Sequence, residues 1–355
     1  MGWSSNTGFG LFDLEVKAAF LLFPMLLWIL PANQALDPSL AWRAFTWANV
    51  GSVVICLGAA MWRFIHEVYL REQGLLPEDP AWTNHFFESR FSFFLHPSYM
   101  AMYLCASLAM VLLKRTGPQP HPWLDQAVPA LLTLGVMLCN SKMGWLTLAA
   151  VLALALLGNW QDARLRSRLI LLAAIGSALF ITLFLSFPTV SGKFVQALSA
   201  TGAIDPTSDQ SSALRRMAWD SALELFRREP LTGSGTGDIK DDLMQQYHEK
   251  GYVHAEAKRM NAHSQFLQSA AALGLPGLVL VLILVLLPLF IAFKTGDRSA
   301  QVFWIIVLLN WSVESMAEVQ AGVVFVAFFG WLQAAGVPVN GSPRPALHQQ
   351  IPSPA

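Results

Sequence analysis

Long apolar segments alternate with short polar connections along most of the chain. A helix needs about 20 mostly apolar residues to cross the hydrocarbon core of a bilayer. Segments of this kind recur often enough to predict an all-α, polytopic membrane protein with about nine transmembrane helices. The predicted spans cover residues 17–31, 44–65, 97–113, 123–140, 143–159, 168–187, 275–293, 300–312 and 321–336.

One long polar segment, residues 188–263, interrupts this pattern between the sixth and seventh predicted spans. It separates an N-terminal transmembrane bundle of about six spans, residues 1–187, from C-terminal transmembrane helices in residues 264–337. The tail, residues 338–355, is rich in proline and is predicted to be disordered and cytoplasmic.

The spacing of apolar residues predicts that the long polar segment is mostly helical. Apolar positions recur every three or four residues between Ser211 and Glu229, which is typical of an amphipathic helix. Asp209 or Ser211 is expected to cap its start. Asp238 is expected to be the N-cap of a second helix that ends near Gly251.

Basic residues in alternate connections predict the orientation of the chain. Cytoplasmic loops carry an excess of Lys and Arg, so the 188–263 segment is predicted to face the outside, as is the chain start. Residues 1–16 lack a signal-peptide pattern. An exported start then leads us to expect a shortened N-terminus, with a re-entrant first span as the alternative. The basic residues assigned to the cytoplasmic side are Arg43, Lys114, Arg115, Arg164, Arg166, Arg168, Lys294, Arg298 and Arg344.

The composition agrees with a membrane protein and excludes several other classes. Of the 355 residues, 54% are hydrophobic and 13% are charged, about half the charged fraction of a soluble domain. Lys plus Arg balance Asp plus Glu at 23 each, which excludes a strongly basic nucleic-acid binder. The three cysteines lie in apolar runs without CxxC spacing, so neither a disulfide framework nor a cysteine zinc site is predicted.

His263 opens the most informative segment, because the polar loop re-enters the membrane at this residue. An imidazole near water but partly desolvated suits a general base working near neutral pH. The alternative is a histidine at a helix start that bonds only to backbone. Gly274 and Gly277 follow, and they let a helix break or pack closely before the next span.

A glycine-rich turn, Gly233-Ser-Gly-Thr-Gly237, lies between the two predicted loop helices. Its backbone N–H groups could bind an anion, or the turn could simply connect two helices tightly. The spacing fits neither a P-loop nor a GxGxxG pattern, so a nucleotide site is not predicted.

Ionisable side chains also gather at the predicted outer edge of the membrane. Such groups are costly at membrane depth and often mark sites or pathways. Lys142 lies in a very short turn before a span, where it could instead extend to the interface. His96 opens the third span and follows Arg90, which could instead pair with Glu88 or Glu67.

Glu314 and Glu318 are expected to share one helical face just outside the eighth span. Two like charges at this spacing are unfavourable unless a cation lies between them. They are predicted to lie on the same side as His263, so the polar groups converge on one region.

A metal site is not predicted. His248-Glu249 resembles the start of HExxH, but Tyr252 occupies the position of the second histidine. His254 and His263 are nine residues apart, which is not a standard ligand spacing.

At these residues the chain resembles the O-antigen ligase and polymerase superfamily of bacterial membrane glycosyltransferases. The family pattern is His, then Asn, Ser or Gln, nine residues, and Gly-x-x-Gly, and the segment from His263-Ser264 to Gly274-Leu-Pro-Gly277 fits it. Upstream, Arg216, Trp219, Pro230, Gly233 and Gly235 resemble the family's Arg…Trp…Pro-x-x-Gly-x-Gly run. Ser141-Lys142, His96-Pro-Ser-Tyr99 and Glu314–Gly322 resemble further family segments.

The resemblance implies transfer of a glycan from an undecaprenyl-diphosphate-linked donor, without metal or other cofactor, at the outer face of the bacterial inner membrane. In that role His263 would be the general base of an inverting displacement, and Arg216 the first candidate to bind the diphosphate, unless it only pairs with Asp220. Further substrate-binding candidates are Arg215, Lys142, Arg90, His96, Gly233 and Gly235. Gly274, Gly277 and Trp219 are expected to be structural.

The acceptor distinguishes the possible activities. Transfer to lipid A core would make the protein an O-antigen ligase, whereas an O-antigen or exopolysaccharide polymerase would join repeat units and a protein O-oligosaccharyltransferase would modify protein. A polysaccharide transporter would predict an internal repeat and ionisable residues at the bilayer midplane, and neither is found in the sequence. The expected partners are the lipid-linked donor, the lipid A core or another sugar acceptor, and the bilayer, but no nucleic acid.

Overall fold

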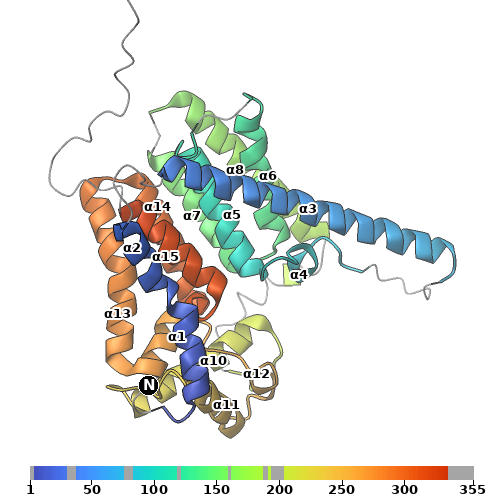
Figure 1. The fold of residues 1–355 in the computed structure, drawn as a ribbon. Coiled ribbons are helices and arrows are strands. Elements are labelled where there is room, and N and C mark those ends of the chain that lie inside the picture. Colours follow the sequence, from blue (N-terminus) through green and yellow to red (C-terminus); the bar gives the residue numbers. More distant parts are fainter. Residues whose placement is uncertain are drawn as a thin grey trace, which may run out of the picture.

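The structure, a computed structural model, describes residues 4–29, 37–75, 83–117, 121–158, 161–186, 191–192 and 204–334. Every regular element in these ranges is a helix (Figure 1). The predicted tail, residues 338–355, lies outside the described residues, as does part of the long polar segment.

Three helices are long and apolar enough to cross a bilayer: α3 (Pro38–Glu72), most of α8 (Ala163–Ser186) and α13 (Gln265–Thr295). Shorter apolar helices are α5 (Pro97–Leu112), α6 (Leu124–Leu138), α7 (Lys142–Gly158) and α15 (Gln320–Ala334), and α14 (Arg298–Val313) packs among them. The protein is therefore an all-helical, multi-pass membrane protein. The total of nine spans stays a prediction.

The first predicted span, residues 17–31, is divided in the structure. Helix α1 (Thr7–Lys17) ends at Lys17, and α2 (Ala19–Ile29) starts two residues later and reaches the end of that described range. Lys17 is held by carboxylates rather than placed inside an apolar span. The first apolar helix therefore begins after Lys17.

Buried amide side chains join helices inside the membrane bundle. The Nδ2 atom of Asn49 in α3 donates to Ser107 Oγ in α5 at 3.0 Å. The Nδ2 atom of Asn310 in α14 donates to Thr147 Oγ1 in α7 at 3.2 Å. Such bonds stabilise helix contacts in an apolar environment. The first bond joins α3 to α5, and the second joins α14 to α7, whose N-terminal end lines the site described below.

The long polar segment forms α10 (Ser211–Arg228), α11 (Ile239–Glu249) and the short α12 (Val253–Ala257). The predicted helices from 211 and after 238 are confirmed. The predicted cap is wrong, because Gln210 is the N-cap of α10 and makes no side-chain capping bond.

These three helices have a hydrophobic core of their own, which includes Leu214, Met217, Leu243 and Tyr247. Ala271 and Ala272, in the first half of α13, complete this core. Figure 1 shows the loop helices gathered at the kinked end of α13. Helices α10, α11 and α12 therefore pack as one body with the start of α13.

Helix α13 bends at Gly274, where φ is 65° and ψ is −155°. A Cβ atom at this position would lie 2.6 Å from the carbonyl carbon of Leu231, so the close approach also requires glycine. The N–H of Leu275 donates to the carbonyl of Pro230 at 2.7 Å. The bend is thus held by the turn that follows α10.

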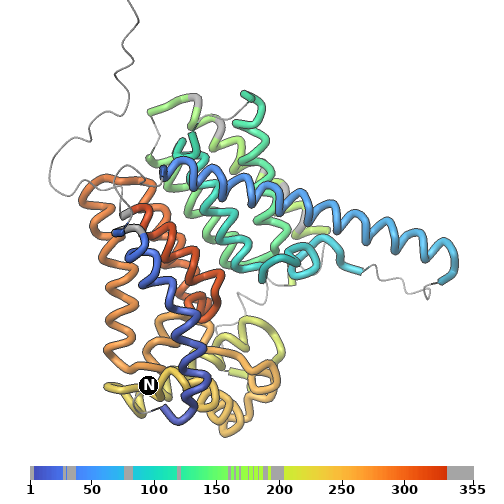
Figure 2. Tube along the Cα trace, viewed as in Figure 1, coloured from blue at the N-terminus to red at the C-terminus, as the bar shows by residue number. Residues whose placement is uncertain are grey.

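The N-terminal residues lie against the loop helices (Figure 2). The Asp238 carboxylate accepts the N–H groups of Ser5 and Asn6, both at 2.7 Å. Asp238 is the N-cap residue of α11 but its side chain does not cap that helix. The hydrogen bonds from Asn6 and Ser5 lower its pKa. The carboxylate therefore fixes the start of α1 to the loop.

Candidate functional site

A cavity of about 640 Å³ lies between α10 and the N-terminal ends of α5 and α7. This volume is within the usual range for ligand sites. Its lining includes three cationic side chains, Lys142, Arg215 and Arg216, and one carboxylate, Glu88. The other lining residues are Ser89, His96, Pro97, Ser98, Asn140, Ser141, Met143, Leu146, Ser211, Ser212, Trp219 and Val313.

Helix α10 supplies both arginines and Trp219 to this cavity. The apolar face of α10, which carries Leu214 and Ala218, is buried in the core of the loop. A different face of α10, which carries Arg215, Arg216 and Trp219 at spacings of three and four residues, lines the cavity. The periodicity that predicts α10 thus also explains the common direction of these three side chains.

His96 and Lys142 reach the cavity from helix starts. His96 is the N-cap of α5, and its Nδ1 atom accepts the N–H of Ser98 at 3.4 Å. Lys142 opens α7, and the Oγ atom of the preceding Ser141 accepts the N–H of Gly144 at 3.2 Å. Helix N-termini carry partial positive charge, so both helices add to the positive potential of the cavity.

His263 is held next to this cavity by its backbone. Its φ angle is 44°, in the left-handed region, and its N–H donates to Asn261 Oδ1 at 3.0 Å. The indole Nε1 of Trp219, which lines the cavity, donates to the His263 carbonyl at 3.0 Å. The side chain is 23% exposed. His263 does not line the cavity itself, but its carbonyl is bonded to Trp219, which does.

The side chain of His263 is oriented by a carboxylate. Its Nδ1 atom lies 3.0 Å from Oε2 of Glu314. Because an ionised carboxylate only accepts hydrogen bonds, Nδ1 carries the hydrogen in the neutral ring and Nε2 keeps its lone pair.

The Glu314 carboxylate accepts hydrogen bonds from three segments of the chain. Besides His263, its carboxylate accepts from the Arg215 guanidinium and, at 3.3 Å, from the hydroxyl of Ser98. Burial opposes ionisation, but the hydrogen bond from His263 and the charge of Arg215 lower the pKa of Glu314 from 4.5 to about 2. The carboxylate is therefore ionised at neutral pH.

A second charged cluster adjoins this one. Lys17 Nζ lies 2.5 Å from Asp13 Oδ1 and 3.0 Å from the Glu318 carboxylate. Gln265, two residues after His263, donates to Glu318 at 3.0 Å. Burial and the neighbouring Glu318 raise the pKa of Asp13 to about 6.

The expectation that Glu314 and Glu318 share one helical face is wrong. Helix α14 ends at Val313, and a 3₁₀ turn, η2 (Met316–Glu318), follows. The two carboxylates therefore bind different cations, Arg215 in one case and Lys17 in the other.

The structure does not bring every candidate residue to the cavity. Arg90 is exposed and does not line it, although Glu88 and Ser89 of the same short helix, α4 (Glu88–Phe91), do. Of the two glutamates predicted as possible partners of Arg90, Glu67 binds Arg71 and His85, and Glu88 accepts from Asn140. The proposed partner of Arg216, Asp220, accepts from Lys250 and Tyr252 at 2.7 and 2.9 Å.

Gly233 and Gly235 also lie away from this cavity, against α13. A Cβ atom on Gly233 would lie 2.6 Å from the backbone nitrogen of Gly274. The N–H groups of Ser234 and Gly235 donate to carbonyls in the preceding turn of α13, at 2.9 and 2.8 Å. Gly277 is similarly crowded, because a Cβ there would lie 2.5 Å from the carbonyl oxygen of Ser269. The turn at Gly233 and Gly235 therefore packs against the bend of α13 at Gly274 and Gly277, and we call this contact the joint.

Sequence patterns did not identify the roles of Ser98, Glu314 and Lys17 in this network. Ser98 and Glu314 lie in segments that resemble the family, and Glu314 and Glu318 were expected to need a cation, but the sequence did not show which residues they would contact. Within the described ranges, no group of three or more His, Cys, Asp or Glu residues is arranged to hold a metal ion.

Residues 127–282 match a protein-family model described as O-antigen ligase. This segment contains Lys142, both cavity arginines, Trp219, His263 and the glycines of the joint. The resemblance to the O-antigen ligase superfamily is thereby confirmed over this segment. No match was found among curated proteins.

Proposed function

We propose that the protein is a membrane glycosyltransferase that moves a polysaccharide from undecaprenyl diphosphate to a sugar hydroxyl of lipid A core, as an O-antigen ligase. The site would face the outside of the inner membrane. The family match supports an enzyme of the O-antigen ligase or polymerase type. The observation that carries the proposal is the His263–Glu314 pair beside a cavity with three cations.

In this mechanism the acceptor oxygen attacks the anomeric carbon of the donor as the bond from that carbon to the diphosphate oxygen breaks. Nε2 of His263 takes the proton of the attacking hydroxyl. Glu314 stabilises the resulting imidazolium and fixes the ring orientation, as the carboxylate does in a catalytic triad. Attack from the face opposite the leaving group inverts the configuration at the anomeric carbon.

The leaving group is undecaprenyl diphosphate, whose negative charge increases as the bond breaks. Cations placed near the leaving oxygens lower the barrier for this step. Arg216 and Lys142 line the cavity and are assigned to the diphosphate, since guanidinium can bind phosphate oxygens with two hydrogen bonds. Arg215 donates hydrogen bonds to the Glu314 carboxylate and to the Val313 carbonyl, so we assign it mainly to positioning that carboxylate.

The test is a His263→Ala variant, with His248→Ala as the matched control. His248 belongs to the same loop segment but its side chain is 79% exposed. Transfer from an undecaprenyl-diphosphate-linked glycan to lipid A core is measured in proteoliposomes, and accumulation in the membrane by immunoblot. Loss of a general base lowers the rate about 10²–10⁴-fold. Undiminished transfer by the His263 variant would refute the catalytic role.

The alternative within the same chemistry is a polymerase or a protein O-oligosaccharyltransferase. The lipopolysaccharide banding pattern of a deletion strain distinguishes them. Loss of the whole ladder with accumulation of lipid-linked polymer indicates a ligase. A single-repeat band indicates a polymerase, and an unchanged ladder with unglycosylated exported protein indicates transfer to protein.

A further inference from the structure

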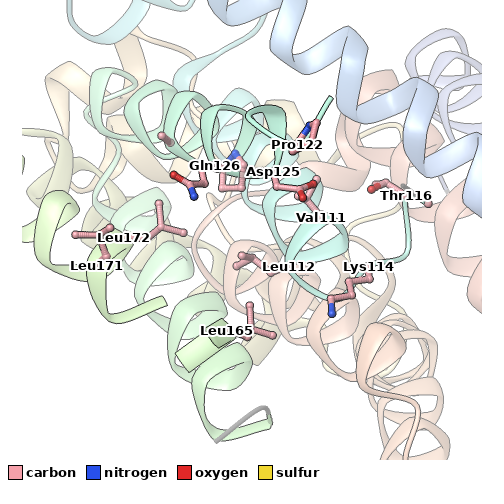
Figure 3. A pocket seen from close by; sticks show the side chains of 13 residues that line it. Val111, Leu112, Lys114, Thr116, Pro122, Asp125, Gln126, Leu165, Leu171 and Leu172 are labelled. Atoms are coloured by element: carbon pink, nitrogen blue, oxygen red, sulfur yellow. The ribbon is translucent and has the colours of Figure 1, made fainter. Parts of the chain in front are cut away.

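Two cavities adjoin at the end of the molecule remote from His263. One, of about 720 Å³, lies between the end of α5, the start of α6 and α8 (Figure 3). The other, of about 410 Å³, lies between the α5–α6 connection and the α13–α14 connection. They share Leu112, Lys114 and Leu165, so they form one continuous site. The length of α13 separates this site from His263.

The smaller cavity is basic. Lys114, Arg115 and Arg298 line it. Arg115 Nη2 lies 3.3 Å from Asp297 Oδ1, whereas Arg298 donates to the neutral carbonyl of Gly158. Asp297 therefore offsets only one of the three cations.

The larger cavity is mainly apolar. Figure 3 shows Leu165, Leu171 and Leu172 of α8 on one side, with Leu112 of α5 near them. Other parts of the protein cover little of helix α8, because only 13% of its most apolar stretch is buried. The cavity therefore opens between helices that would be in contact with lipid. Its remaining lining residues are Val111, Thr116, Gly117, Pro122, Asp125, Gln126, Pro129 and Ala130.

We propose that this paired cavity binds one anionic glycerophospholipid of the bilayer. The phosphodiester headgroup occupies the basic cavity, and an acyl chain occupies the apolar cavity beside α8. Basic pockets between membrane helices are suited to anionic headgroups. A soluble anion would leave the apolar cavity unused, and an apolar ligand would leave the cations unneutralised.

Charge complementarity favours an anionic headgroup. Asp297 offsets Arg115, and Asp125 lines the larger cavity, but Arg43 adds a further cation where it donates to the carbonyl of Thr116, a lining residue. The surroundings of the paired cavity therefore carry excess positive charge, which an anionic headgroup offsets and a zwitterionic headgroup does not. The assignment does not depend on the proposed glycan transfer.

The test is a titration of the purified, detergent-solubilised full-length protein, followed by native mass spectrometry. The probes are phosphatidylglycerol, phosphatidylethanolamine and phosphatidylcholine with identical acyl chains. We expect phosphatidylglycerol to bind about tenfold more tightly than either zwitterionic lipid. Lys114→Gln should weaken phosphatidylglycerol binding about fivefold, because one cation near a headgroup is lost.

A second variant tests the apolar cavity. Ala130 lines it and is exposed, so Ala130→Trp should fill the space without disturbing the protein core. It should weaken the binding of all three lipids and keep their order. The control is Lys258→Gln, an exposed lysine in the loop before His263, which should leave binding unchanged. Equal binding of the three lipids by the wild type, or equal effects of Lys114→Gln and Lys258→Gln, would overturn the proposal.

Discussion

Nδ1 of His263 lies 3.0 Å from Oε2 of Glu314, a residue 51 positions further along the chain. The contact places the imidazole of the family motif against a carboxylate at the end of another helix, α14. The same carboxylate binds Arg215, so His263 and a cation of the neighbouring cavity contact one residue. The site is therefore a network in which His263 and the cavity are positioned together.

Glu314→Gln should lower the transfer rate about a hundredfold or more while the protein still accumulates in the membrane. An amide can donate to Nδ1 and stabilise the wrong tautomer, and it cannot stabilise the imidazolium by charge. Glu256→Gln, at a carboxylate 40% exposed beside His248, is the control. A wild-type transfer rate in the Glu314 variant would contradict the positioning role.

Glu314 should also contribute to stability in a pH-dependent way. Its pKa is lowered from 4.5 to about 2, so its contribution is fully present above pH 4.5 and is lost as the pH falls toward 2. This contribution is on the order of 3 kcal/mol. Thermal unfolding in detergent should therefore show wild type more stable than Glu314→Gln at pH 7, with the difference narrowing by pH 3. A difference that is constant from pH 7 to pH 3 would argue against the lowered pKa.

Arg216→Lys should reduce transfer by about tenfold or more, although the charge is kept. Lysine is a point charge and cannot reproduce two parallel hydrogen bonds to a diphosphate. Arg227→Lys, at an exposed position near the end of the same helix, should have no effect on the rate. If both variants transfer at the wild-type rate, Arg216 has a structural role or none.

The joint between the glycine motifs predicts a difference between two Gly→Ala variants. Gly233 and Gly251 both have φ near 65°, at 64° and 68°, but only Gly233 would place a Cβ atom against backbone. Gly251→Ala should cost about 1–2 kcal/mol from the left-handed conformation alone. Gly233→Ala should cost several kcal/mol more and reduce accumulation, because the turn must move away from the bend in α13. Equal melting temperatures of the two variants would exclude the joint as a stabilising contact.

Lys17→Met should destabilise the protein by about 3 kcal/mol, because it leaves Asp13, 5% exposed, and Glu318 without their shared cation. Adding Asp13→Asn and Glu318→Gln to this variant should restore much of the melting temperature. The pattern is measured by thermal unfolding of the purified variants. If the melting temperature does not recover in the triple variant, uncompensated charge is not the cause of the destabilisation.

Composition and periodicity determined the class of this protein and much of its local structure. The apolar segments indicated a helical membrane protein, and spacing placed α10 and α11 within a residue or two of their observed bounds. His263 and the glycines were identified as one contiguous motif. These features are readable because helix amphipathicity, turn residues and motif spacing all act over a few neighbouring residues.

The tertiary structure alone decided which distant groups meet. It paired His263 with Glu314, joined Glu318 to Lys17, and gathered Lys142 with the arginines of α10 around one cavity. It also placed Gly233 against the bend at Gly274 and left Arg90 outside the cavity. These contacts depend on how α5, α7, α10 and α14 pack, and on where α14 ends. Local periodicity states which face of each helix is apolar but not which other helix that face will meet.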